Sequence, residues 1–331
     1  SEETKKHIDL VTRVRQRQET DLSSFPDAVA LILATEVAQI ECLKSCHSVD
    51  YATSRLAAGY SLGEIAANIC GGVIPFDEAL GVPVSLAPDC AELGATTRMG
   101  IVFSRTGQID LEKIERLCVS ITMEKKGTIA ISAMLSPNTV LILGQNDTVE
   151  RFSNLRREIF PKGVHFRKNP DHWPPLHTPI VRQRNITDRA SSRLQSMGGN
   201  LAAPVPPIAS LVTGKINYND YNSREILNDW TDHPQRVWDT VCETLASGIR
   251  VIIHVGPEPN LFPATYKRLA DNIMGQNQAS GTTGLGRRLV SGMVDRPWLA
   301  ALLPSQANLL RAPSLKHVVL EDWLLQHDQI D

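Results

Sequence analysis

A serine flanked by glycines offers the clearest chemistry in the sequence. Ser61 stands in the pattern Gly-Tyr-Ser-Leu-Gly of residues 59–63, after a short apolar run and before a stretch with the pattern of an apolar helix. A serine at a tight strand-to-helix turn is held clear of the backbone, and glycines on both sides let the turn close. The first N–H groups of the helix would face the reacting centre, where the Leu62 amide could stabilise an oxyanion. The pattern predicts nucleophilic chemistry at Ser61, although a Gly/Ser turn can also match it by chance.

A serine hydroxyl needs a general base, and one of the nine histidines stands apart. His177 lies in the sequence Trp-Pro-Pro-Leu-His-Thr-Pro of residues 173–179, which the prolines stiffen. A rigid loop suits a base, because a base must stay within hydrogen-bond reach of its nucleophile. Most other histidines lie in polar, terminal or loop segments. His254 falls in an expected buried strand, where it either forms a core hydrogen bond or lines a site.

Composition excludes several classes of function. Lys and Arg number 34 against 36 Asp and Glu, so no basic excess exists to bind nucleic acid. The apolar stretches are broken well before the roughly 18 residues of a membrane span, and the charged N-terminus is no secretory signal. The six cysteines lack the spacing of a metal site, which favours reduced thiols. We expect a cytoplasmic protein with no metal, no nucleic-acid partner and no membrane span.

The middle of the chain predicts a small unit of its own. The pattern indicates a strand at 99–104, a helix after Asp110, a hairpin over 129–143, a helix around Phe152 and a strand at 164–167. Strand–helix–strand–strand–helix–strand is the ferredoxin-like plan. On either side an α/β pattern is expected, with a long helix from Phe25 and strands at 208–212 and 251–255.

These elements predict an α/β fold in which a large α/β-hydrolase-like core with a parallel sheet carries an inserted, small ferredoxin-like α+β subdomain. We expect the core in two parts, residues 1–98 with Ser61 and residues 175–274 with His177, around an insert at 99–174. Residues 275–331 are expected to form a linker, over about 275–287, and a helical C-terminal extension.

Five motifs occur in an order and at a spacing that resemble a known family. They are GYSLGE (59–64), AISAMLSPNTVLILG (130–144), PLHTP (175–179), ASLVTG (209–214) and IHVGPEPNL (253–261). This set resembles the malonyl-CoA:acyl carrier protein transacylases and the acyltransferase domains of polyketide synthases. The resemblance extends from about residue 26 to residue 270.

The resemblance implies a ping-pong acyl transfer in fatty-acid or polyketide synthesis. Ser61 would take the acyl group from a coenzyme A thioester while His177 accepts its proton. His177 would then activate the phosphopantetheine thiol of an acyl carrier protein, which removes the acyl group. Acyl-CoA would be a substrate, and no cofactor is implied.

The resemblance also implies the surroundings of this pair. A backbone carbonyl would hold the histidine, and we place it near Ser247. The Leu62 amide would be one oxyanion donor, and Tyr60, Ser247 and His254 would line the substrate site. The cleft between core and insert would hold the pantetheine arm.

The sequence departs from the family's pattern in three places. Tyr60 replaces the family's histidine before the nucleophile. The stretch from Gly81 to Cys90, around Leu86, contains no arginine where the family binds the malonyl carboxylate, which favours a neutral acyl group. The N-terminal strand with a GQG-like loop, the family's source of a second oxyanion amide, is not recognisable before Ser61.

Two other functions therefore stay open. The same Ser61–His177 pair could hydrolyse wrong acyl groups from a carrier protein. Alternatively, the chain could be a non-catalytic carrier-binding module of a synthase complex, with the helical tail after residue 295 as its interaction surface.

Overall fold

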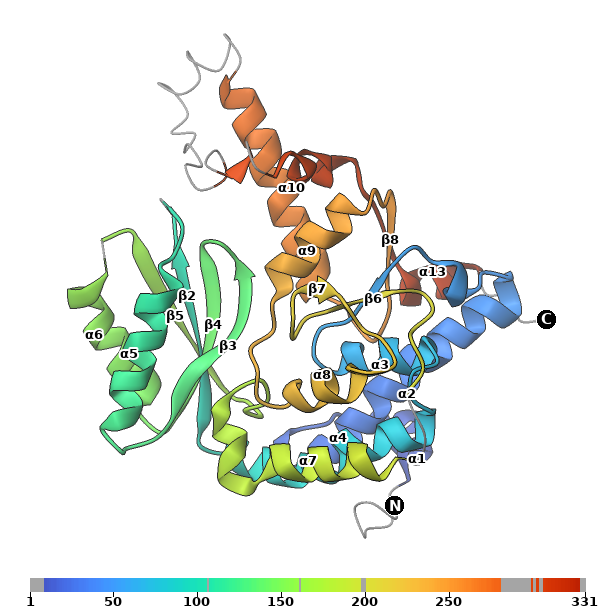
Figure 1. Ribbon diagram of the computed structural model, residues 1–331, viewed down its shortest axis with the longest axis horizontal. Helices are drawn as coiled ribbons and strands as arrows, with labels where there is room; N and C mark the ends of the chain where they lie inside the picture. The colour runs from blue at the N-terminus through green and yellow to red at the C-terminus, as the bar shows by residue number, and fades with distance from the viewer. Residues whose placement is uncertain are drawn as a thin grey trace.

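The computed structural model describes residues 9–105, 107–160, 162–197, 201–280, 299, 302–303 and 306–327. Figure 1 shows a smaller unit, built on one sheet with two helices, beside a larger unit of helices around short strands. The smaller unit is formed by the middle of the chain, and the larger unit by the segments before and after it. This arrangement puts Ser61 and His177 in the larger unit, on opposite sides of the inserted segment in sequence.

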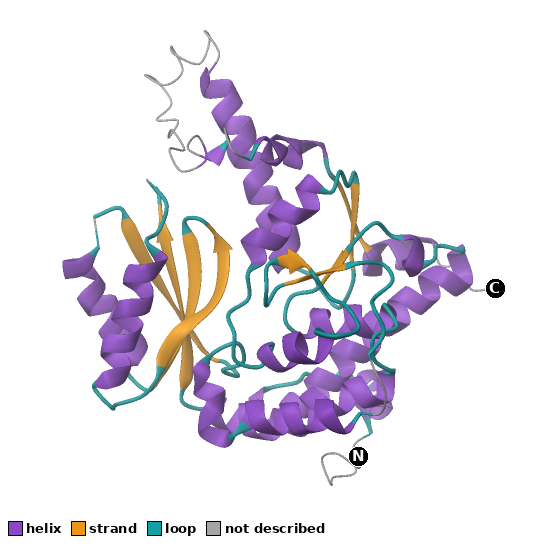
Figure 2. Cartoon of the chain, in the orientation of Figure 1, coloured by secondary structure: helices purple, strands orange, loops and turns teal. Residues whose placement is uncertain are grey.

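The smaller unit has the element order that the sequence predicts. Its four strands form an antiparallel sheet in the order β3-β4-β2-β5, and both helices cover one face of this sheet (Figure 2). Asp110 caps the first helix by accepting the Lys113 N–H, and Phe152 and Ile114 fill the space between helices and sheet. The elements are β2 (Thr97–Ser104), α5 (Leu111–Met123), β3 (Ile129–Ser136), β4 (Thr139–Gln145), α6 (Thr148–Ile159) and β5 (Val164–His172).

Helices dominate the larger unit. The expected long helix begins at Phe25 with Pro26 in its first turn, where the missing N–H costs nothing. Pro83 and Pro88 lie inside a further helix that the sequence does not predict, and that helix is buried in the main core. These helices are α2 (Phe25–His47), α3 (Leu62–Cys70), α4 (Phe76–Gly94), α7 (Ile186–Ser196) and α8 (Ser223–Asp229).

The strands of the larger unit are short and form two separate sheets. In the first, β1 (Ala57–Ala58) pairs parallel with β6 (Ile208–Ser210), and β6 pairs antiparallel with β7 (Lys215–Ile216). In the second, β8 (Val251–His254) pairs parallel with β9 (Lys316–Val319). The parallel pairing expected of the core is therefore present, but it is divided between two sheets rather than continuous.

The C-terminal region differs from the expected linker and helical tail. The helix α10 (Leu261–Ser280) continues through 275–280, so that part of the expected linker is helical, and residues 281–287 lie outside the described residues. Strand β9 interrupts the expected helical tail. Its residues Val318 and Val319 are β-branched, which favours a strand, and they pair with Ile253 and His254 of β8. The other elements here are α9 (Val237–Ala246), η4 (Ala307–Ser314) and α13 (Leu320–His327).

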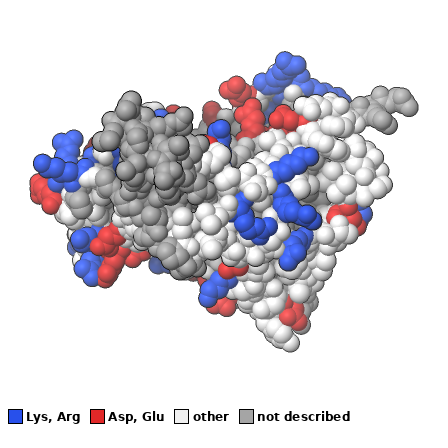
Figure 3. Space-filling view, turned by 90° about the horizontal axis from the view of Figure 1, so that it is seen from above, with Lys and Arg blue, Asp and Glu red and all other residues white. Residues whose placement is uncertain are grey.

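The remaining short elements connect these parts. They are α1 (Leu10–Arg15) and the 3₁₀ turns η1 (Leu22–Ser24), η2 (Tyr51–Thr53) and η3 (Pro179–Arg184). Across the described ranges, no helix has both the length and the apolar character needed to cross a membrane. Figure 3 shows a face on which several Lys and Arg side chains gather on an otherwise mostly uncharged surface.

Candidate active site

Ser61 lies at a sharp turn between β1 and α3, as its sequence pattern predicts. Its backbone has φ 54° and ψ −117°, a conformation that L-residues rarely adopt. Such strain costs about 1–3 kcal/mol and persists only where the surrounding structure enforces it. A Cβ on Gly59 would lie 1.9 Å from the Gly63 carbonyl carbon, so the turn closes only because residue 59 is glycine.

His177 makes direct contact with Ser61. Its Nε2 lies 2.8 Å from Ser61 Oγ, and its Nδ1 lies 2.7 Å from the Trp230 carbonyl oxygen. A carbonyl oxygen can only accept a hydrogen bond, so Nδ1 carries the proton and Nε2 is free to accept the Ser61 hydroxyl. The two side chains have the hydrogen-bonded geometry of a nucleophile and its general base.

The surroundings keep His177 neutral. Its side chain is 4% exposed, and burial lowers its pKa to about 4, with the Trp230 carbonyl acting in the opposite direction. The His177 backbone N–H donates to the Thr231 carbonyl at 2.8 Å, and this contact holds the residue at φ 65°. An imidazole that is neutral at pH 7 is in the protonation state that a general base requires.

The segment 230–235 holds both members of the pair. Besides its carbonyl contact to His177, Trp230 donates from Nε1 to the Ser61 carbonyl oxygen at 2.9 Å. Gln235 accepts the Ser61 N–H through Oε1 at 3.2 Å. The strained Ser61 backbone is therefore bound on both of its peptide groups by side chains from one segment.

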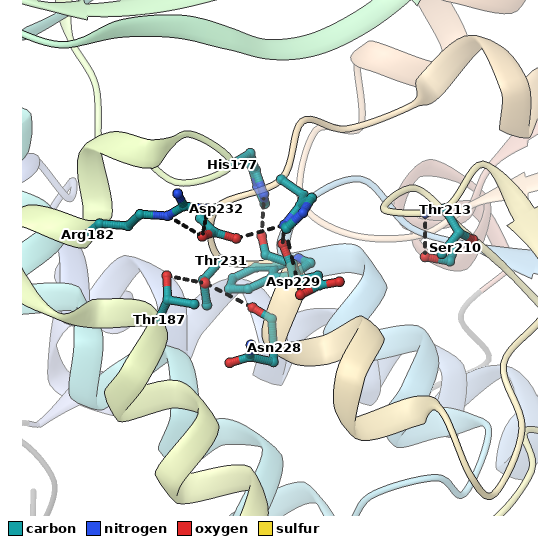
Figure 4. A network of polar contacts seen from close by, with 11 residues as sticks. His177, Arg182, Thr187, Ser210, Thr213, Asn228, Asp229, Thr231 and Asp232 are labelled. Carbon is teal, nitrogen blue, oxygen red and sulfur yellow. Dashed lines mark hydrogen bonds and ion pairs between the residues drawn. The ribbon is translucent and has the colours of Figure 1, made fainter.

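A polar network fixes this segment in place (Figure 4). The buried carboxylate of Asp232 accepts hydrogen bonds from Arg182 and from His233 Nδ1, both at 2.8 Å. The Thr231 hydroxyl donates to the Asn228 carbonyl at 2.9 Å. Because Arg182 lies in η3, just after His177, the network joins the histidine loop to the segment that holds it.

The structure brings together some of the other predicted site residues. Leu62 is the first residue of α3, where its N–H has no partner within the helix and lies directly after the nucleophile. The Tyr60 ring centroid lies 6.4 Å from that of His177, and burial raises the pKa of Tyr60 to about 12. Tyr60 thus stays a neutral hydroxyl beside the base.

The placement of the histidine's carbonyl partner near Ser247 is wrong. Trp230 supplies that carbonyl, while Ser247 ends α9 and its hydroxyl donates to the Glu243 carbonyl at 2.8 Å. His254 lies in β8, where its Nε2 is 2.9 Å from His317 Nδ1 in the neighbouring strand β9. Its ring therefore takes part in a contact between these two strands.

A cavity of about 790 Å³ adjoins the turn that carries Ser61. Gly59, Tyr60 and Gly63 line one side of it, and β8 with His254 lines the other. Its lining comes from the larger unit alone, so this cavity is distinct from the expected cleft between core and insert. Both β1 and β8 lie at the edge of their sheets, since among the described strands β1 pairs only with β6 and β8 only with β9.

The stretch around Leu86 offers no cation to the site. Leu86 is 2% exposed within α4 and packs in the main core. Arg98 lies in β2 and donates to the Pro170 carbonyl, and Arg182 is already paired with Asp232. Among the described residues, no three His, Cys, Asp or Glu side chains gather closely enough to hold a metal ion.

Trp230 and Gln235 were missed by the sequence reasoning. A backbone carbonyl leaves no signal, because every residue has one. A tryptophan within the polar sequence Asn-Asp-Trp-Thr-Asp-His of residues 228–233 could have drawn attention, since a large ring in such a segment needs a structural reason.

Comparisons with known proteins bear on this geometry. No family model matches the chain. It is 26% identical over 216 residues to a malonyl CoA-acyl carrier protein transacylase of Haemophilus influenzae, covering 65% of each chain. It is 24% identical over 264 residues, or 78% of its length, to 3% of a polyketide synthase of Streptomyces halstedii.

A solved structure decides the fold. An acyl carrier protein S-malonyltransferase of Vibrio cholerae superposes with a TM-score of 0.64 and 24% identity, over 78% of this chain and 79% of that one. The chain has the fold of the malonyl-CoA:acyl carrier protein transacylases. This confirms the resemblance that the five motifs predict. The chain spans just under two thirds of the Haemophilus transacylase and a small part of the synthase.

Proposed function

We propose that this chain transfers an acyl group from a coenzyme A thioester to the phosphopantetheine thiol of an acyl carrier protein. The observation that carries the proposal is the 2.8 Å contact between Ser61 Oγ and His177 Nε2, with Nδ1 fixed by the Trp230 carbonyl. The curated relative from Haemophilus influenzae is named as a malonyl CoA-acyl carrier protein transacylase, which supports both the reaction and the partner.

The reaction proceeds in two balanced halves. Ser61 Oγ attacks the thioester carbonyl carbon while its proton passes to His177 Nε2. The C–S bond then breaks, the coenzyme A sulfur takes that proton, and an acyl-serine remains. In the second half, His177 takes the proton of the carrier thiol, whose sulfur attacks the ester carbonyl, and Ser61 Oγ leaves and recovers the proton.

The Leu62 N–H stabilises the negative oxygen that forms in each half. It lies at the start of α3, where the helix dipole favours negative charge. Loss of one such donor typically slows acyl transfer about 10²–10³-fold, which sets the size of the contribution expected of the Leu62 N–H. The reaction uses side chains and backbone groups of this chain and requires no cofactor.

The acyl group of the proposal is neutral. A malonyl carboxylate in a partly buried pocket needs a cationic partner. Burying a polar group without a hydrogen-bond partner costs on the order of 2–7 kcal/mol of binding free energy. Arg55 and Arg250 line the cavity beside the Ser61 turn. The stretch from Gly81 to Cys90, where the resembled family binds the carboxylate, has no arginine, and Arg98 and Arg182 are engaged with Pro170 and Asp232. Acetyl or longer acyl thioesters are therefore the preferred donors.

The proposal includes the finer architecture and the location of the chain. We take the larger unit as an α/β-hydrolase-like core and the unit from β2 to β5 as a ferredoxin-like subdomain, with the pantetheine arm between them. A cytoplasmic location accords with six cysteines that are all free thiols.

Transfer and hydrolysis are separated by following a labelled acyl group. The chain is mixed with radiolabelled acetyl-CoA, with and without a phosphopantetheinylated acyl carrier protein. We expect label on the carrier at a rate above its release as free acid. Free acid alone would instead indicate a hydrolase, and carrier binding that is unchanged in Ser61→Ala without any turnover would indicate a docking module.

A further inference from the structure

Gln235 connects the smaller unit to the nucleophile. Its backbone N–H donates to the Ser132 carbonyl and its carbonyl accepts from the Met134 N–H, each at 2.8 Å. These bonds make a parallel bridge to Ala133 in β3. The Gln235 side chain accepts the Ser61 N–H at 3.2 Å. One residue thus joins the edge of the β3 strand to the turn that carries Ser61.

The orientation of the Gln235 carboxamide follows from this contact. The Ser61 N–H can only donate, so the Gln235 oxygen must face it and Nε2 must be directed elsewhere. Gln235 is 0% exposed, and its Nε2 has no hydrogen-bond partner in the part of the chain that the structure describes. An unpaired buried donor costs about 1–3 kcal/mol, and buried polar groups are as a rule paired. Since Nε2 shares its carbon with the atom that contacts Ser61, this unpaired donor lies beside the nucleophile.

We infer that Gln235 positions Ser61 through Oε1 and donates through Nε2 to an oxygen of the acyl group bound there. The inference rests on the proposed acyl transfer and names a further residue for it. A neutral amide N–H suits either the carbonyl oxygen that every acyl thioester carries or the carboxylate of a malonyl group. Because the backbone of Gln235 is bonded to β3, the contact also links the insert to the geometry of Ser61.

Two variants separate the acceptor from the donor. Gln235→Leu removes both, and Gln235→Glu keeps the acceptor but donates only while its carboxyl is protonated. Acylation of Ser61 is measured in single turnovers with acetyl-CoA and malonyl-CoA between pH 5 and 9. We expect Gln235→Leu to slow acylation about 100-fold, in the range found for lost oxyanion-type donors, with little change in half-saturation. Gln235→Glu should slow as the pH rises, while the wild type stays constant.

The two donors identify the oxygen that Nε2 binds. An equal loss with acetyl-CoA and malonyl-CoA in Gln235→Leu assigns the contact to the carbonyl oxygen. A larger loss with malonyl-CoA assigns it to the carboxylate. Thermal unfolding of each variant over the same pH range shows that the protein remains folded during the assay.

A matched control and a second probe keep the test decisive. Gln145→Leu removes another buried glutamine, which bonds to Gln183 rather than to Ser61, and should acylate within twofold of the wild type. A fluorophosphonate reports Ser61 reactivity without acyl-CoA. Wild type that reacts with the fluorophosphonate but with no acyl-CoA would contradict the proposed function, while slower labelling of Gln235→Leu would still support the positioning role. Acylation of Gln235→Leu within threefold of wild type, or a constant pH profile for Gln235→Glu, would overturn the inference.

Discussion

The indole of Trp230 donates to the Ser61 carbonyl, while the backbone carbonyl of the same residue accepts from His177. One residue therefore fixes the nucleophile through its side chain and the base through its backbone. This relationship explains how Ser61 is held in a strained conformation and how His177 keeps the tautomer that a base requires. The two contacts can be tested separately, because a substitution at position 230 removes the indole donor to Ser61 and leaves the backbone carbonyl that holds His177.

Trp230→Phe removes the indole donor and keeps the ring and the carbonyl. A hydrogen bond contributes about 0.5–1.5 kcal/mol, so we expect acylation of Ser61 to slow roughly fivefold. The measurement is the single-turnover rate of acyl-serine formation. Trp238→Phe is the matched control, since Trp238 packs in the separate core cluster with Leu245 and Ile273. Equal slowing in both variants would mean that the Trp230 contact has no specific role.

The acylation rate should depend on pH through His177. Burial lowers the pKa of His177 to about 4, so the imidazole is neutral and able to accept a proton above that pH. We expect the rate to rise as the pH increases through about 4 and then to remain constant from about 5.5 to 8. Single-turnover rates across this range provide the test. A midpoint near 6.5, the ordinary value for histidine, would show that His177 is solvated in the working enzyme.

The stability of the fold should fall at higher pH because of Glu64. This residue is 0% exposed, accepts from the Leu211 N–H and the Tyr218 hydroxyl, and burial raises its pKa to about 7. The folded state holds the proton more tightly than the unfolded state, so this contribution is complete below about pH 4.5. It is lost as the pH rises through about 7, by at most roughly 3 kcal/mol.

Glu64→Gln tests this dependence. An amide cannot ionise, so the free energy of unfolding should change less between pH 5 and pH 8.5 in the variant than in the wild type. The variant should also lose stability at pH 5, because its NH₂ group cannot accept both hydrogen bonds. Urea unfolding at the two pH values measures both effects. An unchanged pH dependence in Glu64→Gln would assign it to other groups.

The sequence predicts the elements whose signals are local. Pro26 and the apolar pattern after it mark the start of α2, and Asp110 marks the start of α5. The glycines around Ser61 predict the turn, since the backbones of Gly59 and Gly63 touch there. The proline-rich loop of His177 predicts a rigid mount for a base, and the structure brings that base to the serine.

Contacts between segments that are distant in the sequence could not be predicted, because they leave no local sequence signal. Helix α4 contains Pro83 and Pro88, which normally end a helix, and burial of Leu86 in the core outweighs that local signal. Strand β9 forms because β8 offers it a pairing edge from another part of the chain. The Trp230 carbonyl lies 53 residues beyond His177, and no residue type reveals which carbonyl will face a histidine.

Intact-protein mass spectrometry shows directly whether Ser61 carries an acyl group. The wild type and Ser61→Ala are incubated with malonyl-, acetyl- and medium-chain acyl-CoA, and the mass of each chain is measured. We expect one acyl adduct on the wild type with acetyl or a longer neutral acyl group, a weaker adduct with malonyl, and none on Ser61→Ala. No adduct with any donor on the folded wild type, or an equal adduct on Ser61→Ala, would contradict this expectation.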